Sequence, residues 1–94
     1  MTVVDKLRML LGRKASHYRA VFNTETVAGS EVLADLSTFC RAHEPTFHPD
    51  PRLEGILQGR REVWLHIQNY TKLSTDELVR IRLNALEQKR DPGA

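Results

Sequence analysis

Apolar residues recur at intervals of three and four along most of the 94-residue chain, which is the spacing of one face of an α-helix. At the N-terminus this pattern comprises Val3, Val4, Leu7, Leu10 and Leu11. With Thr2 as the N-cap and Gly12 as the stop, it predicts a first helix over residues 2–11. A shorter helix is predicted over 15–22. Its inward-facing residues are Tyr18, Val21 and Phe22.

The remaining sequence predicts three longer segments. A helix is expected from the turn at 23–26 to about residue 42, and its apolar side contains Val32, Leu33, Leu36, Phe39, Cys40 and His43. Prolines at 45, 49 and 51 cannot continue that helix, because proline lacks the backbone N–H and disfavours helix in the residue before it. A long helix is expected from about 51 to 70. Ser74 and Glu77 have capping-box spacing and predict a last helix that fades near Gln88.

No segment alternates apolar and polar residues as a strand does, so the chain is expected to be all-α. We predict a small orthogonal or irregular bundle of four to five helices rather than a coiled coil, because no heptad persists for three repeats. The length of 94 residues indicates one domain, placed at 1–90, with a frayed C-terminal tail at 91–94.

Composition limits the class of protein. The chain is 40% apolar and 28% charged, which is typical of a soluble domain. A net charge of +2 does not require a nucleic-acid partner. No apolar run is long enough for a signal peptide or a membrane span, so no membrane association is expected. A single cysteine indicates a reducing compartment.

Three glycines and an arginine are unexpected inside helices. Glycine costs roughly 1 kcal/mol relative to alanine in a helix interior, so Gly55 and Gly59 predict close packing of a neighbouring helix, with Gly29 or Ala34 opposite. A hinge or a docking site for a partner is the alternative.

Arg60 lies where an apolar residue is expected, and a partly buried guanidinium requires an acceptor. We predict a structural ion pair between Arg60 and Asp35, with Glu54 as the second choice. Arg61 is expected to point toward solvent. A phosphate- or partner-binding role for the two arginines is the alternative.

No reaction centre can be recognised. Cys40, His43 and His48 suggest a metal site, but nothing selects the fourth ligand that structural zinc requires. Cys40 and His43 also lack the oxyanion donor and orienting group of a nucleophilic site. We therefore expect no enzyme activity, no catalytic residue, no metal and no cofactor, and we expect Cys40 to be a small buried apolar residue.

The last helix suggests a contact surface. Ile81 and Ala85 can face the core while a second stripe remains free, and an exposed apolar stripe is typical of a partner surface. The candidate surface consists of Val79, Leu83, Leu86, Trp64 and Arg61.

Part of the sequence resembles a family of small tailed-phage proteins that are encoded among virion assembly genes. The resemblance covers residues 18–68 and reads like Gly-x-x-Val-Leu-x-Asp-Leu-x-x-Phe-Cys followed by Gly-Arg-Arg. The matching residues are Val21, Phe22, Gly29, Val32, Leu33, Ala34, Asp35, Leu36, Phe39, Cys40, Phe47, Gly59, Arg60, Arg61, Val63 and Leu65. Two positions depart from the pattern, because Gln58 stands in place of a glutamate and Trp64 is bulkier than expected.

The resemblance implies a phage protein of the host cytoplasm or the virion, with a non-enzymatic role in building or packing the particle. We expect it to contact other phage structural proteins or further copies of itself, because a small domain gains stability by burying another apolar face. Nucleic-acid binding by the basic helices is a less favoured alternative. A second alternative is inhibition of a host enzyme through Trp64 or the proline-rich loop.

Overall fold

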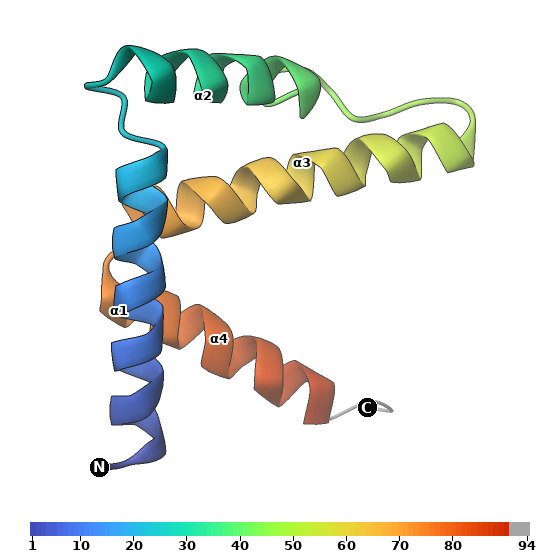
Figure 1. Cartoon of the computed structure of the whole chain (residues 1–94). Helices are drawn as coiled ribbons and strands as arrows, with labels where there is room; N and C mark the ends of the chain where they lie inside the picture. The colour runs from blue at the N-terminus through green and yellow to red at the C-terminus, as the bar shows by residue number, and fades with distance from the viewer. Residues whose placement is uncertain (91–94) are drawn as a thin grey trace.

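The computed structural model describes residues 1–90 and consists of four α-helices (Figure 1). They are α1 (Val3–Val21), α2 (Val27–Phe39), α3 (Pro51–Lys72) and α4 (Thr75–Arg90). No strand occurs between residues 1 and 90, so the predicted all-α class is confirmed, with four helices. The predicted tail at 91–94 lies outside the described residues.

The first helix is longer than the pattern predicted. Residues 3–21 form one helix, so the expected stop at Gly12 and the separate helix at 15–22 are wrong. Leu11 and Ala15 flank Gly12 and are buried at 3% and 0% exposure. Their burial on one continuous helix outweighs the roughly 1 kcal/mol that a single interior glycine costs.

The helix N-termini match the sequence signals. Thr2 caps α1, where the Asp5 N–H donates to Thr2 Oγ1 at 3.1 Å and the Thr2 N–H donates to Asp5 Oδ2 at 3.2 Å. Hydrogen bonding to the carboxyl of Asp5 by the Thr2 side chain, and next by the Thr2 backbone N–H, lowers the pKa of that carboxyl below its usual value. The predicted capping box of Ser74 and Glu77 is confirmed by a reciprocal pair of 3.2 Å hydrogen bonds before α4.

The end of α2 differs from its predicted place near 42. The helix stops at Phe39, and Arg41 adopts a left-handed φ of 53°. The Arg41 N–H donates to the Thr38 carbonyl, and the Ala42 N–H donates to the Ser37 carbonyl. These two bonds form a Schellman motif, which ends a helix by satisfying its last carbonyls.

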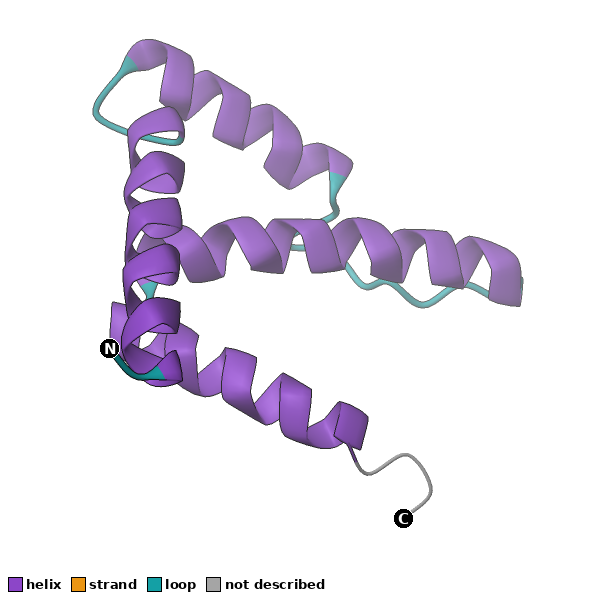
Figure 2. Cartoon of the chain, turned by 60° about the horizontal axis from the view of Figure 1, so that its bottom comes forward, coloured by secondary structure: helices purple, strands orange, loops and turns teal. Residues whose placement is uncertain are grey.

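The helices α2, α3 and α4 extend to the same side of α1 (Figures 1 and 2). α1 packs against the C-terminal part of α3 and the start of α4, whereas α2 contacts α3 lightly. The core beneath α1 consists of Leu11, Ala15, Tyr70, Leu78 and Val79, with Leu7, Tyr18 and Leu73 packed against it. No residue of α2 belongs to this core.

The molecule is flat and open. Its extents are 46 × 44 × 13 Å and its radius of gyration is 16.0 Å, against about 12 Å for a compact chain of this length. It exposes 7268 Å² of surface, whereas a compact monomer of 10.8 kDa exposes about 5,500 Å². Within residues 1–90, no helix is long and apolar enough to cross a membrane.

Candidate interaction surface

Aromatic rings hold α1 against α3 where the two helices cross. The Tyr18 ring stacks on Tyr70 with centroids 4.8 Å apart, and His66 meets both rings edge-on at 5.8 and 5.0 Å. Lys14 Nζ lies 5.9 Å from the centroid of the Tyr70 ring. Offset and edge-on contacts of this kind add about 0.5–1.5 kcal/mol per pair to the buried area.

Two arginines of α1 connect it to the α3–α4 junction. Arg19 donates from Nε to the Thr71 carbonyl at 3.3 Å and from Nη2 to the Leu73 carbonyl at 2.8 Å. Arg8 forms a salt bridge with Asp76 in the first turn of α4 at 3.1 Å. Both side chains of that pair are exposed, and a single exposed salt bridge contributes little to stability.

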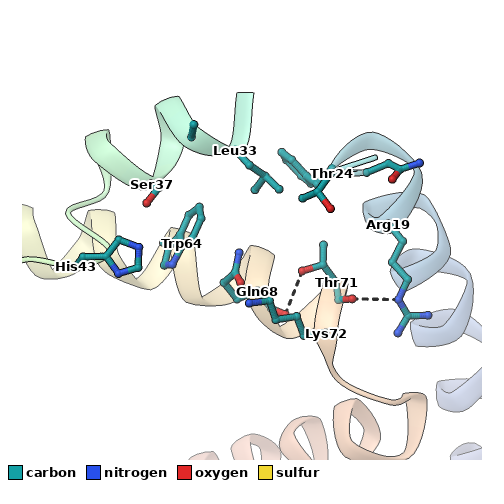
Figure 3. Close-up of a pocket in the computed structure, with 12 residues that line it drawn as sticks. Arg19, Thr24, Leu33, Ser37, His43, Trp64, Gln68, Thr71 and Lys72 are labelled. Atoms are coloured by element: carbon teal, nitrogen blue, oxygen red, sulfur yellow. Dashed lines mark hydrogen bonds between the residues drawn. The ribbon is translucent and has the colours of Figure 1, made fainter. Parts of the chain in front are cut away.

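A cleft of about 640 Å³ opens between the end of α1, α2 and α3. In Figure 3, Ser37, His43 and Trp64 lie toward one end, while Arg19, Thr71 and Lys72 lie toward the other. The remaining lining residues are Phe22, Asn23, Thr24, Leu33, Ala34 and Gln68. The predicted partner residue Trp64 is therefore a half-buried wall of this cleft.

The cleft is lined by basic and hydroxyl side chains, among them His43, Lys72 and Ser37, but by no acidic one. No thiol lines it either, and Arg19 already donates to two main-chain carbonyls. Cys40 is 2% exposed, which confirms the prediction of a buried apolar role. Residues 1–90 contain no group of three or more His, Cys, Asp or Glu side chains that could hold a metal ion.

The predicted ion pair between Arg60 and Asp35 is wrong. The salt bridges of the described side chains are those of Arg8 with Asp76 and Arg41 with Glu44. The Arg60 guanidinium instead lies over the Phe39 ring, 4.4 Å from its centroid. The Phe39 ring is therefore the electrostatic partner of Arg60, in place of the carboxylate that the sequence predicts.

Arg61 does not point to solvent as predicted. It is half-buried, and its Nη1 donates to the Glu44 carbonyl at 2.9 Å and to the Arg41 carbonyl at 3.5 Å. It thereby fastens the loop after α2 to the middle of α3. Backbone carbonyls occur at every residue, so the sequence contained no signal for this contact.

The glycine packing prediction is wrong at Gly55 and Gly59. A Cβ added at either position would have no atom within 4 Å beyond its own helix. Gly29 is buried, but against the turn that precedes its own helix. A Cβ there would lie 2.1 Å from the Asn23 carbonyl oxygen and 2.8 Å from Thr26 Oγ1.

The predicted stripe on α4 is partly exposed. Val79 is 5% exposed and belongs to the core, which corrects its assignment to a partner surface. Leu83 and Leu86 are 40% and 49% exposed, and Ile81, expected to be inside, is 46% exposed. The reason is that α4 extends away from α1 beyond its first turns (Figure 1).

The structure reveals a second apolar surface, which sequence reasoning missed. Phe39 of α2, Ile56 and Val63 of α3, and Val21 of α1 are 57%, 51%, 54% and 66% exposed. Val63 and Val21 share an apolar groove of about 350 Å³ whose other lining residues are His17, Tyr18, Phe22, His66 and Ile67. Arg60, one turn from both Ile56 and Val63, connects them to Phe39. We call Val21, Phe39, Ile56 and Val63 the apolar face.

These features define a small, open, all-α protein that exposes apolar side chains on all four helices. Comparison with protein families identifies the family to which the chain belongs. A model of the Bbp19-like phage proteins matches residues 18–84, from the second half of α1 into α4, and the chain belongs to this family. No curated protein and no solved structure matches it.

Proposed function

We propose that this phage protein acts through protein–protein contact in virion assembly, either as an assembly factor or as a minor component of the particle. The observation that carries the proposal is the open shape, which exposes about 1,700 Å² more surface than a compact chain of this mass. Apolar side chains on all four helices lie on this surface, and exposed apolar patches are typical of a protein that is completed by a partner.

The α4 stripe of Leu83 and Leu86 is the proposed contact with other phage structural proteins. It continues the line of Val79, which α1 covers, onto the part of α4 that no other helix covers. Because these leucines are exposed at 40% and 49%, burying them in a complex would release ordered water without any rearrangement of the core.

A role in binding also suits the cleft between α1, α2 and α3. Its lining contains no carboxylate or thiol, and the cysteine of the chain is buried elsewhere. We therefore propose a non-enzymatic protein, and we favour proteins over nucleic acids as partners because the net charge is only +2.

The experiment uses a phage that lacks the gene, complemented in the host by wild-type protein or by the Leu83→Glu variant. A glutamate at this 40%-exposed position should leave the fold intact but prevent burial of the stripe, since burying an unpaired carboxylate is costly. We expect particle yield to fall at least tenfold. Asn84→Glu adds the same charge on a neighbouring exposed position of α4 and should retain wild-type yield.

Mass spectrometry of purified virions separates the two forms of the proposal. Presence in the particle identifies a minor component, whereas absence together with reduced yield identifies an assembly factor. A protein that is absent from virions and dispensable for their yield would contradict the proposal. Binding to DNA at about 50 mM salt that weakens steeply with added salt would favour the nucleic-acid alternative instead.

A further inference from the structure

We infer that the cleft between α1, α2 and α3 binds an acidic, extended segment of a partner protein. The inference rests on the proposed role in protein–protein contact and names the chemistry of one partner segment. It concerns a different part of the molecule from the α4 stripe, because neither Leu83 nor Leu86 lines the cleft.

Each long wall of the cleft is one face of a helix. The α3 wall consists of Trp64, Gln68, Thr71 and Lys72. The α2 wall consists of Leu33, Ala34 and Ser37. Residues at these spacings lie on the same side of a helix, so both helices turn a continuous face toward the cleft. Its volume of about 640 Å³ lies within the range of concave ligand sites.

The charged groups of the cleft have one sign. Its ionisable side chains are those of Arg19, His43 and Lys72, and no Asp or Glu of the described residues accompanies them, although the chain contains 12 acidic residues. No salt bridge of the described side chains involves any of the three. A concave site with charge of one sign and apolar walls attracts ligands of the opposite sign. The lining is therefore complementary to carboxylates.

The cationic groups stand at opposite ends of the cleft. Arg19 and Lys72 lie at the end near α1, whereas His43 lies with Trp64 at the other end (Figure 3). Trp64 and Lys72 are eight positions apart on α3, which corresponds to about 12 Å along a helix axis. An extended peptide covers that distance in about four residues. Two carboxylates about four residues apart in a partner segment therefore match the two ends.

Apolar and hydrogen-bonding groups accompany the charges. Leu33 lies between the two ends (Figure 3), and it is half-buried, as is Trp64. A side chain between the two acids of a partner segment can therefore pack against the leucine and the indole. Ser37 and Gln68 also line the cleft and offer donors and acceptors to the main chain of such a segment.

The separation of the cations favours a peptide over a nucleotide or free phosphate. A phosphate group is bound by donors that converge on one point, commonly the N–H groups of a helix N-terminus or a glycine-rich loop. No glycine of the described residues lines the cleft. The α2 N-terminus is already capped, because the Gly29 N–H donates to Thr26 Oγ1 at 3.0 Å.

A segment in the cleft would join α2 to α3. α2 contributes no residue to the core and contacts α3 lightly, so few interactions hold it in place. A ligand that touches both walls binds only while α2 is in position, and it therefore stabilises that position by linkage. Binding at this site thus has a second, structural readout.

Tryptophan fluorescence of the purified full-length protein tests the inference, because Trp64 lines the cleft and is the single tryptophan. The probe is the end-blocked pentapeptide Asp-Ser-Leu-Ser-Glu, whose first, third and fifth side chains share one side when it is extended. The control peptide has Asn and Gln in place of the two acids. We expect a saturable change in emission with a Kd between about 10 μM and 1 mM, and binding of the control about tenfold weaker.

Two pairs of variants locate the effect. Lys72→Met keeps the apolar stem but removes the ammonium, and it should weaken binding of the acidic peptide by about fivefold. Lys6→Met makes the same change at an exposed position of α1 outside the cleft and should not. Ala34→Glu places an acid in the lining and should abolish binding, whereas Ala28→Glu, exposed on the same helix outside the cleft, should not. Circular dichroism of each variant verifies that the helices are retained.

Hydrogen exchange provides the second readout. With the acidic peptide at saturation, amides of α2 should exchange more slowly than in the free protein, since opening of α2 then requires release of the peptide. Amides of residues 80–88 in α4 should be unaffected.

The absence of a saturable response to the acidic peptide up to about 5 mM, where millimolar affinity is detectable, would overturn the inference. Equal affinity for the two peptides would do so as well, as would equal effects of Lys72→Met and Lys6→Met. Tighter binding of inorganic phosphate or of a nucleoside triphosphate than of the peptide would assign the cleft to small anions instead. None of these outcomes alters the effect of Leu83→Glu on particle yield, so the cleft and the proposed function can fail separately.

Discussion

Glycines at three helical positions of this chain have different surroundings and therefore different consequences. Gly29 is buried against Asn23 and Thr26 in the turn before α2, where a methyl group has no room. Gly55 is open to solvent. Sequence reasoning predicted that all three pack closely. It could not separate them, because helical spacing says where a residue lies on its helix and not what faces it.

Substitution by alanine is expected to have opposite effects on stability at the crowded Gly29 and at the open Gly55. Gly29→Ala should lower the free energy of unfolding by about 1–3 kcal/mol, because the new Cβ would lie 2.1 Å from the Asn23 carbonyl oxygen. Gly55→Ala should raise it by about 0.5–1 kcal/mol, because alanine is the better helix former and meets nothing. Urea denaturation of both variants measures the difference. Effects of the same sign would show that the turn at 23–26 yields to the methyl group.

Arg60 illustrates another limit at this scale. Its position on an apolar side correctly indicated partial burial, but the partner is an aromatic ring rather than the carboxylate of Asp35. A guanidinium accepts either kind of neighbour. Only the relative position of α2 and α3 decides between them, and that position is not encoded in the spacing of either helix.

At the scale of elements, the sequence predicts where helices begin more accurately than where they end. Thr2, Ser74 and Pro51 each marked a helix N-terminus, because side-chain caps and proline act locally. Gly12 does not stop α1, because the burial of Leu11 and Ala15 favours a continuous helix through it. The end of α2 was misplaced because Arg41, not a glycine, adopts the left-handed conformation there.

The hydrogen bonds of Arg61 are expected to hold the loop after α2 against α3. Arg61→Met keeps the apolar stem but removes the hydrogen bonds to the Arg41 and Glu44 carbonyls. We expect the free energy of unfolding to fall by about 1 kcal/mol and amides of residues 41–50 to exchange faster with deuterium. Arg52→Met, on an exposed position of the same helix, is the control. Unchanged exchange in the loop of the Arg61 variant would contradict the assigned role.

At the scale of the whole molecule, the all-α class and the helices of the second half followed from the sequence, but the open arrangement did not. An apolar stripe shows which side of a helix avoids water. It does not show whether this chain or another molecule covers that side. Ile81 was predicted to face the core for this reason, yet it is 46% exposed.

The openness itself can be measured in solution. Small-angle X-ray scattering of the protein, extrapolated to zero concentration, should give a radius of gyration near the 16.0 Å of the structure and well above the roughly 12 Å of a compact chain. The reason is that α3 and α4 pack together and against α1 only near the turn that joins them. A value close to 12 Å would mean that the helices close on one another in solution.

The absence of α2 from the hydrophobic core affects how the protein opens. Its attachments are light contacts with α3, the ring contact with Arg60 and the hydrogen bonds that Arg61 makes to the loop. Regions with few buried apolar contacts unfold locally at free energies far below that of global unfolding. Thermal motion will therefore release α2 as a unit while α1, α3 and α4 stay folded, and each such excursion uncovers Cys40, the one thiol of the chain.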